Sequence, residues 1–392
     1  MSHSDKQVLI HTPHMVATMQ QLRRSARLAR RWDSDPDDIC SPGAHHIGKD
    51  IDSLATYPDT TSNQDDDDDD MEGVKHPSYR INCLDSNHIV FQHPHEQLPD
   101  AVAAHVGQLA SITPEMPGLA PEIVAKAIYD LDTLGMGCNE IDVSSYLNTH
   151  LFPQGATTRF PTGSLLSVAG THMARHLLPN LPTAMAPWAV TQPRPDLLYG
   201  YPKTPTFTSA QLITLQGLHR QIPAYAQASP GLWFPFFAVE FKAAAGTGGN
   251  LWVAANQCAG TSAACVQAVN QLNIGLGDVG CNGHVPDLCY SLAIDNSLAQ
   301  LYVSWGVKDK GNLVVCIQRV GSFLLSSPKH FTRLHRWVTA ILEWGQGGRL
   351  GNIQLALDYI RGEQQKVMSR AAKSRPRSER EGSPERKRRG LR

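Results

Sequence analysis

The sequence lacks the segments that would place a chain in or across a membrane. No uninterrupted apolar run approaches the roughly 20 residues that a membrane-spanning helix needs. The first ten residues, MSHSDKQVLI, have no basic start followed by an apolar stretch, so we expect no secretory signal. We therefore expect a protein that is neither secreted nor inserted in a membrane.

Cysteine is also scarce. The eight cysteines in 392 residues are too few for a disulfide scaffold, and no two of them form a C-x-x-C pair. A reducing compartment, the nucleus or the cytoplasm, is the expected location.

Charged residues make up only 18% of the chain, and they are bunched. The front of the chain holds six consecutive aspartates, Asp65 to Asp70, whereas residues 370–392 hold ten basic and three acidic residues. Runs of like charge cannot bury apolar surface, so we predict that 1–75 and 369–392 are disordered tails. The cluster Arg386-Lys387-Arg388-Arg389 is typical of a nuclear-import signal or a nucleic-acid patch, and a solubility tail is the alternative.

Between the tails we predict a transitional segment over 76–119, with one short helical patch, and an α/β domain over 120–368. The expected helices are 121–134, 139–151, 209–226, 250–272, 329–344 and 352–368. The expected strands are 196–201, 234–241, 288–294, 299–307 and 312–320.

One strand ends in a polar pair. The segment FFAVEF is followed at once by Lys242, and the period-2 geometry of a strand places Glu240 and Lys242 on the same face. An ion pair at the rim of the sheet is the simplest reading. Pro195-Asp196 opens the preceding strand, however, so two neighbouring strands each present a carboxylate beside a lysine. Mg²⁺ is commonly held by one or two carboxylates together with phosphate oxygens and waters.

The pattern Pro195-Asp196 … Glu240-Phe241-Lys242 resembles the signature of the PD-(D/E)XK nuclease superfamily. The flanking sequence resembles an uncharacterised fungal group of such proteins. The resemblance implies a restriction-endonuclease-like core, a central mixed sheet flanked by helices, built as helix, three strands, helix, strand. The 44 residues between Asp196 and Glu240 then imply an inserted helix.

The resemblance also implies roles for individual residues. Asp196 and Glu240 would be metal ligands, Lys242 would position the attacking water, and the carbonyl of Phe241 could add a ligand. Gln257 is similar to a glutamine that some members place on the following helix. Glu122 could match an acidic residue of the first helix, although a helix N-terminal carboxylate is the simpler reading. The implied cofactor is Mg²⁺, with Mn²⁺ possible.

Two functions fit the sequence. The first is a Mg²⁺-dependent nuclease that hydrolyses phosphodiester bonds of DNA or RNA. The second is a catalytically inactive protein that kept the nuclease fold and binds nucleic acid or a protein partner.

Overall fold

The computed structural model describes residues 73–112, 119–152, 164–179, 188–219, 225–244 and 249–374. The predictions made for the aspartate run and for the basic cluster lie outside these residues. The longer helices are α3 (Asp100–Ile112), α4 (Pro121–Leu134), α5 (Glu140–His150), α6 (Ser209–Gly217), α7 (Leu251–Asp278), α8 (Pro328–Trp344) and α9 (Leu350–Ser374). The strands are β1 (Ile89–Phe91), β2 (Leu166–Val168), β3 (Leu197–Pro202), β4 (Gln227–Ser229), β5 (Leu232–Phe241), β6 (Cys289–Ile294), β7 (Leu298–Asp309) and β8 (Asn312–Leu324).

All eight strands join one mixed sheet in the order β1-β8-β7-β6-β5-β3-β2, with β4 paired to β5 beside this path. β3 runs antiparallel to β5, and β5 runs parallel to β6. A parallel pair needs a long crossover, and α7 makes it. The predicted α/β class, a central mixed sheet flanked by helices, is confirmed.

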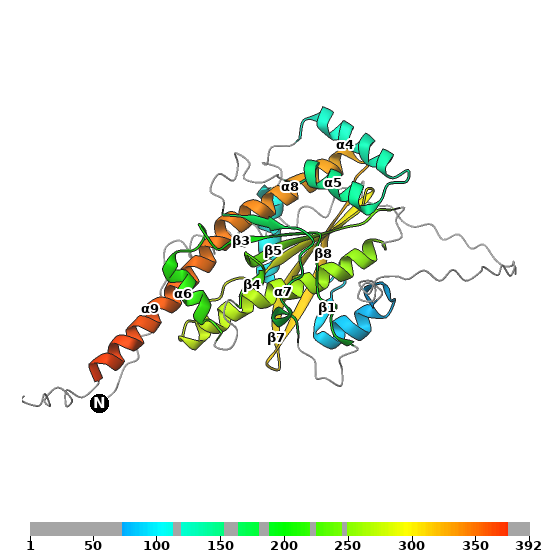
Figure 1. Cartoon of the computed structure of the whole chain (residues 1–392). Coiled ribbons are helices and arrows are strands. Elements are labelled where there is room, and N and C mark those ends of the chain that lie inside the picture. The colour runs from blue at the N-terminus through cyan, green and yellow to red at the C-terminus, as the bar shows by residue number, and fades with distance from the viewer. Residues whose placement is uncertain are drawn as a thin grey trace, which may run out of the picture.

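The middle of the sheet is covered on both sides (Figure 1). α7 packs against β5, β6 and β7, while α8 packs against β8, α3 and α4. Every residue of β5 and β6 is buried as a result, which explains why both read as nearly continuous apolar runs. Among the described residues, no helix combines the length and apolar character needed to cross a membrane.

Local sequence signals explain several element boundaries. The side chain of Asn250 caps α7 by accepting the N–H groups of Trp252 and Val253. Asp295 accepts the N–H groups of Ser297 and Leu298 in the β6–β7 turn. The inserted helix implied by the spacing of the two carboxylates is α6, and it lies between β3 and β5 as expected.

Several elements differ from the prediction. α6 ends at Gly217 rather than near 226, because glycine weakens a helix and Pro223 follows. α9 continues to Ser374, so the helix extends six residues into the segment predicted as a tail. The transitional segment supplies β1, which pairs in parallel with β8 and extends the sheet by one strand.

Arg349 fixes the first residues of β5. It lies in the five-residue π-helix Gly345–Arg349 between α8 and α9, and only 2% of it is exposed. Its Nη1 donates to the carbonyl of Phe234 at 3.0 Å and to the hydroxyl of Tyr201 at 3.2 Å, and its Nη2 donates to the carbonyl of Pro235 at 3.3 Å. These bonds tie the two C-terminal helices to the strand whose other end carries Glu240.

Candidate active site

Asp196 stands directly before β3 and reaches across to the end of β5. The antiparallel register pairs Leu197 with Val239, so Asp196 lies beside Glu240 and Phe241. The carboxylate oxygen Oδ2 of Asp196 accepts the backbone N–H of Phe241 at 2.7 Å. This bond orients the carboxylate before any ligand binds.

Glu240 is the most deeply buried acidic residue of the site, with 2% of it exposed. Burial raises the pKa of Glu240 well above its ordinary value, and the nearby negative charge of Asp196 raises this pKa further. The two carboxyls form a side-chain hydrogen bond with each other. The pKa of Glu240 is raised further than that of Asp196, so a proton held between the two carboxyls favours Glu240.

Lys242 is also 2% exposed, and its partner comes from another element. The Nζ atom of Lys242 lies 3.2 Å from both carboxylate oxygens of Glu140. Glu140 is the first residue of α5, directly after Asn139, which forms a capping box with Asp142. Burial raises the pKa of Glu140, whereas the charge of Lys242 lowers it. The side chain of Glu140 is 35% exposed, so this end of the site is open to solvent.

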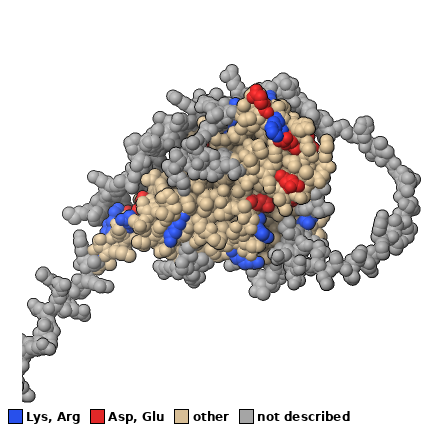
Figure 2. Space-filling model, turned by 45° about the horizontal axis from the view of Figure 1, so that its top comes forward, with Lys and Arg blue, Asp and Glu red and all other residues tan. Residues whose placement is uncertain are grey.

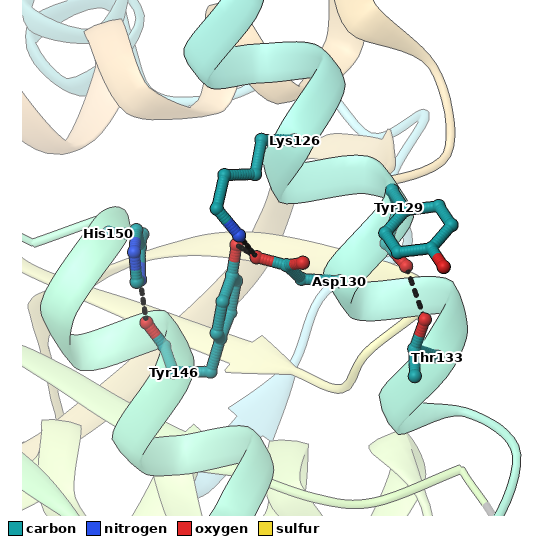
Figure 3. Close-up of polar contacts among 6 residues, drawn as sticks. All are labelled: Lys126, Tyr129, Asp130, Thr133, Tyr146 and His150. Carbon is teal, nitrogen blue, oxygen red and sulfur yellow. Dashed lines mark hydrogen bonds and ion pairs between the residues drawn. The ribbon is translucent and has the colours of Figure 1, made fainter.

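A polar cluster holds α5 against α4 (Figure 3). Asp130 of α4 accepts from Lys126 Nζ at 2.6 Å and from the Tyr146 hydroxyl of α5 at 2.8 Å. The His150 ring stacks on Tyr146 with centroids 4.2 Å apart. The pair of helices therefore has a fixed geometry, and it carries Glu140 to the carboxylates.

The structure brings three of the four predicted site residues together, namely Asp196, Glu240 and Lys242. Gln257 is a half-buried residue of α7, and its role stays a prediction. Its neighbour Cys258 lies close enough for both carboxyls to influence its thiol, whose pKa is raised chiefly by burial. Glu122 is exposed in the first turn of α4, as the simpler reading of that residue proposed. The helical acidic residue that contacts the site is Glu140 of α5, through Lys242.

The matching family model covers residues 133–357 and is described as a domain of unknown function, DUF7924. The chain belongs to the DUF7924 family. No curated protein and no solved structure matches the chain. The matched part of the chain includes α5 and all the strands from β2 to β8. It therefore includes Glu140, Asp196, Glu240 and Lys242.

The donor atoms of this DUF7924 site are suited to a hard divalent cation. Two carboxyl groups lie side by side where β3 and β5 meet, and a cation can take the place of a proton held there. Within the described residues, no three His, Cys, Asp or Glu side chains are arranged to hold a metal by themselves. Mg²⁺ fits this limit, because it keeps several waters and needs only one or two protein carboxylates. Asp196 and Glu240 are the residues that would hold it.

Proposed function

We propose that this protein is a metal-dependent nuclease that hydrolyses phosphodiester bonds of nucleic acid, with Mg²⁺ as the cofactor and Mn²⁺ as a possible substitute. One observation carries the proposal. A hydrogen-bonded pair of carboxyls and a buried lysine meet at the adjoining ends of β3 and β5. The order helix, three strands, helix, strand, represented by α5, β2, β3, β5, α7 and β6, is that of the PD-(D/E)XK core and supports the proposal.

Each residue then has a task. Asp196 and Glu240 would hold the cation, and a proton held between them would be released to solvent when it binds. Lys242 holds its ammonium group beside the carboxylates, where it can donate a hydrogen bond to the attacking water or to a phosphate oxygen. Glu140 fixes the direction of that ammonium group. The bound Mg²⁺ would polarise the phosphoryl oxygen and lower the pKa of the attacking water.

An inactive, nucleic-acid-binding or partner-binding protein is the second candidate, and one observation favours it. Lys242 is almost fully buried and paired with Glu140, so in this arrangement its ammonium group points to a protein carboxylate rather than to a substrate. For catalysis, Lys242 would have to contact the attacking water, either while it stays paired with Glu140 or after it leaves Glu140.

A cleavage assay with the full chain separates the two candidates. We expect labelled DNA or RNA to be cut in Mg²⁺ or Mn²⁺, and we expect Asp196→Asn to reduce cutting by at least a hundredfold while nucleic acid still binds. Asp287→Asn is the matched control, because it also follows a proline and is buried, but it precedes β6 at the opposite end of the sheet. Binding without cutting by the parent protein would favour the inactive candidate.

A further inference from the structure

Arg194 is an exposed arginine set between two buried prolines, Pro193 and Pro195, and it comes two residues before Asp196. Proline fixes its own φ angle and restricts the residue before it. The backbone on both sides of Arg194 is therefore stiff, which is unusual for an exposed basic residue.

Main-chain hydrogen bonds hold this segment further. The carbonyl of Pro193 accepts the N–H of Met173 at 2.8 Å, and the carbonyl of Pro195 accepts the N–H of Gly170 at 3.0 Å. The guanidinium itself is oriented, because Arg194 Nε donates to the carbonyl of Gly170 at 2.8 Å. Gly170 has a φ of +55°, a conformation that glycine adopts without strain.

The Nε–H bond to Gly170 fixes the orientation of the Arg194 guanidinium. Among the residues that the structure describes, the Nη1 and Nη2 groups of Arg194 have no hydrogen-bond partner. Its positive charge reaches the metal site: burial raises the pKa of Asp196, and Arg194 is among the groups that lower it. Two parallel N–H groups on a fixed guanidinium match the two oxygens of a phosphate.

We infer that Arg194 binds a backbone phosphate of the nucleic acid next to the one held at Asp196 and Glu240. The inference rests on the proposed function for the identity of the ligand. The face seen in Figure 2 shows scattered blue side chains and no continuous basic stripe. Without such a stripe, a few well-placed contacts must supply the attraction to the phosphates. A pre-oriented arginine beside the carboxylates is suited to that task.

The test measures binding of the full chain to labelled duplex and single-stranded oligonucleotides over a salt series, with Ca²⁺ in place of Mg²⁺ to limit cutting. Arg194→Ala should weaken binding roughly ten- to a hundredfold, since one charge-assisted contact is lost. The slope of log affinity against log salt should flatten by about 0.9 on duplex DNA or about 0.7 on a single strand. Arg194→Lys should keep the slope and recover only part of the affinity.

Lys310→Gly is the control. It removes one positive charge from the β7–β8 turn, at the opposite end of the sheet from the site, where φ is +49° and glycine is well tolerated. We expect it to leave binding and slope unchanged. Equal affinity and slope for Arg194→Ala and the parent protein would overturn the inference. Cutting by the parent in Mg²⁺ is measured separately. If the parent binds nucleic acid without cutting it, and Arg194→Ala still binds more weakly, the result supports the inference and contradicts the nuclease proposal.

Discussion

Glu240 shows what a buried carboxyl costs a protein that has not bound a cation. It sits on a strand with no exposed residue, so its charged form is disfavoured and its proton is retained. The unfolded chain loses this proton at the ordinary glutamate pKa. Stability of the metal-free protein must therefore fall as the pH rises from that value towards the raised pKa of folded Glu240.

Glu240→Gln should remove this loss. The amide cannot ionise but can still donate a hydrogen bond to Asp196. We expect the variant to be more stable than the parent at pH 8 without metal, by about 1.4 kcal/mol for each unit by which the folded pKa exceeds the ordinary one. Denaturant unfolding at pH 5 and pH 8 measures this, and the difference should shrink at pH 5.

Glu363→Gln, in an exposed pair with Lys366 on α9, is the control and should change stability little at either pH. Addition of Mg²⁺ should reverse the order at pH 8, because the parent alone keeps both ligands. A parent protein whose stability does not depend on pH would contradict the shared-proton description.

The contact between Lys242 and Glu140 gives a second prediction at this scale. Glu140→Gln leaves a buried ammonium group without its carboxylate, so we expect a loss of about 1–3 kcal/mol in unfolding free energy. Lys242→Met in the Glu140→Gln background should regain most of it, since the buried charge is then absent. A double-mutant cycle by denaturant unfolding measures the coupling, and a coupling near zero would mean that the contact contributes nothing to stability.

The sequence predicted part of this site. Asp196 and Glu240 lie on predicted strands, Lys242 directly follows one, and the three match a known spacing, so their proximity could be anticipated. Glu140 could not be selected, because its signal is an acidic residue in the first turn of a helix, and Glu122 offers that signal on α4 as well. The choice between them depends on how α4 and α5 pack, which is a contact between helices and leaves no local pattern.

At the scale of elements, α5 links helix capping to the site. Asn139 accepts the N–H of Asp142 at 3.0 Å, and Asp142 accepts the N–H of Asn139 in return. Asn139→Ala should cost about 1 kcal/mol of stability and loosen the first turn, where Glu140 lies. We therefore expect it to lower cutting several-fold in the nuclease assay.

Thr208→Ala provides the comparison. Thr208 and Gln211 form the same capping box at the start of α6, which packs against α9 and carries no site residue. We expect a similar loss of melting temperature and no effect on cutting. Equal effects of the two variants on activity would show that the α5 cap acts through general stability alone.

Long helices and strands could be predicted from the sequence, whereas the shortest strands could not. The long strands and α7 were expected because their apolar runs and turn residues are clear, although α7 extends beyond 272 to Asp278. β1, β2 and β4 have three residues each, too few to show a period of two. They are strands because a neighbour supplies a partner, which is tertiary information.

At the scale of the whole molecule, the segment that follows α9 in the sequence is rich in Lys and Arg, whereas the basic side chains on the face seen in Figure 2 are scattered. We propose that it serves nuclear import and phosphate contacts. Deletion of 375–392 keeps α9 complete and should leave the melting temperature unchanged. It should flatten the salt dependence of nucleic-acid binding and shift a fluorescently tagged protein towards the cytoplasm. An unchanged slope and an unchanged nuclear fraction would reduce this segment to a solubility tail.

The parallel pairing of β1 with β8 has a consequence for synthesis of the chain. Ile89 lies opposite Val315, more than two hundred residues later. At ordinary translation rates this separation lasts on the order of ten to forty seconds. During that time β1 has no partner strand, and for the earlier part of it Arg80 also lacks Asn256, the side chain to which it donates a hydrogen bond. β1 can therefore join the sheet only after β8 has been synthesised, and until then its apolar residues are available to chaperones.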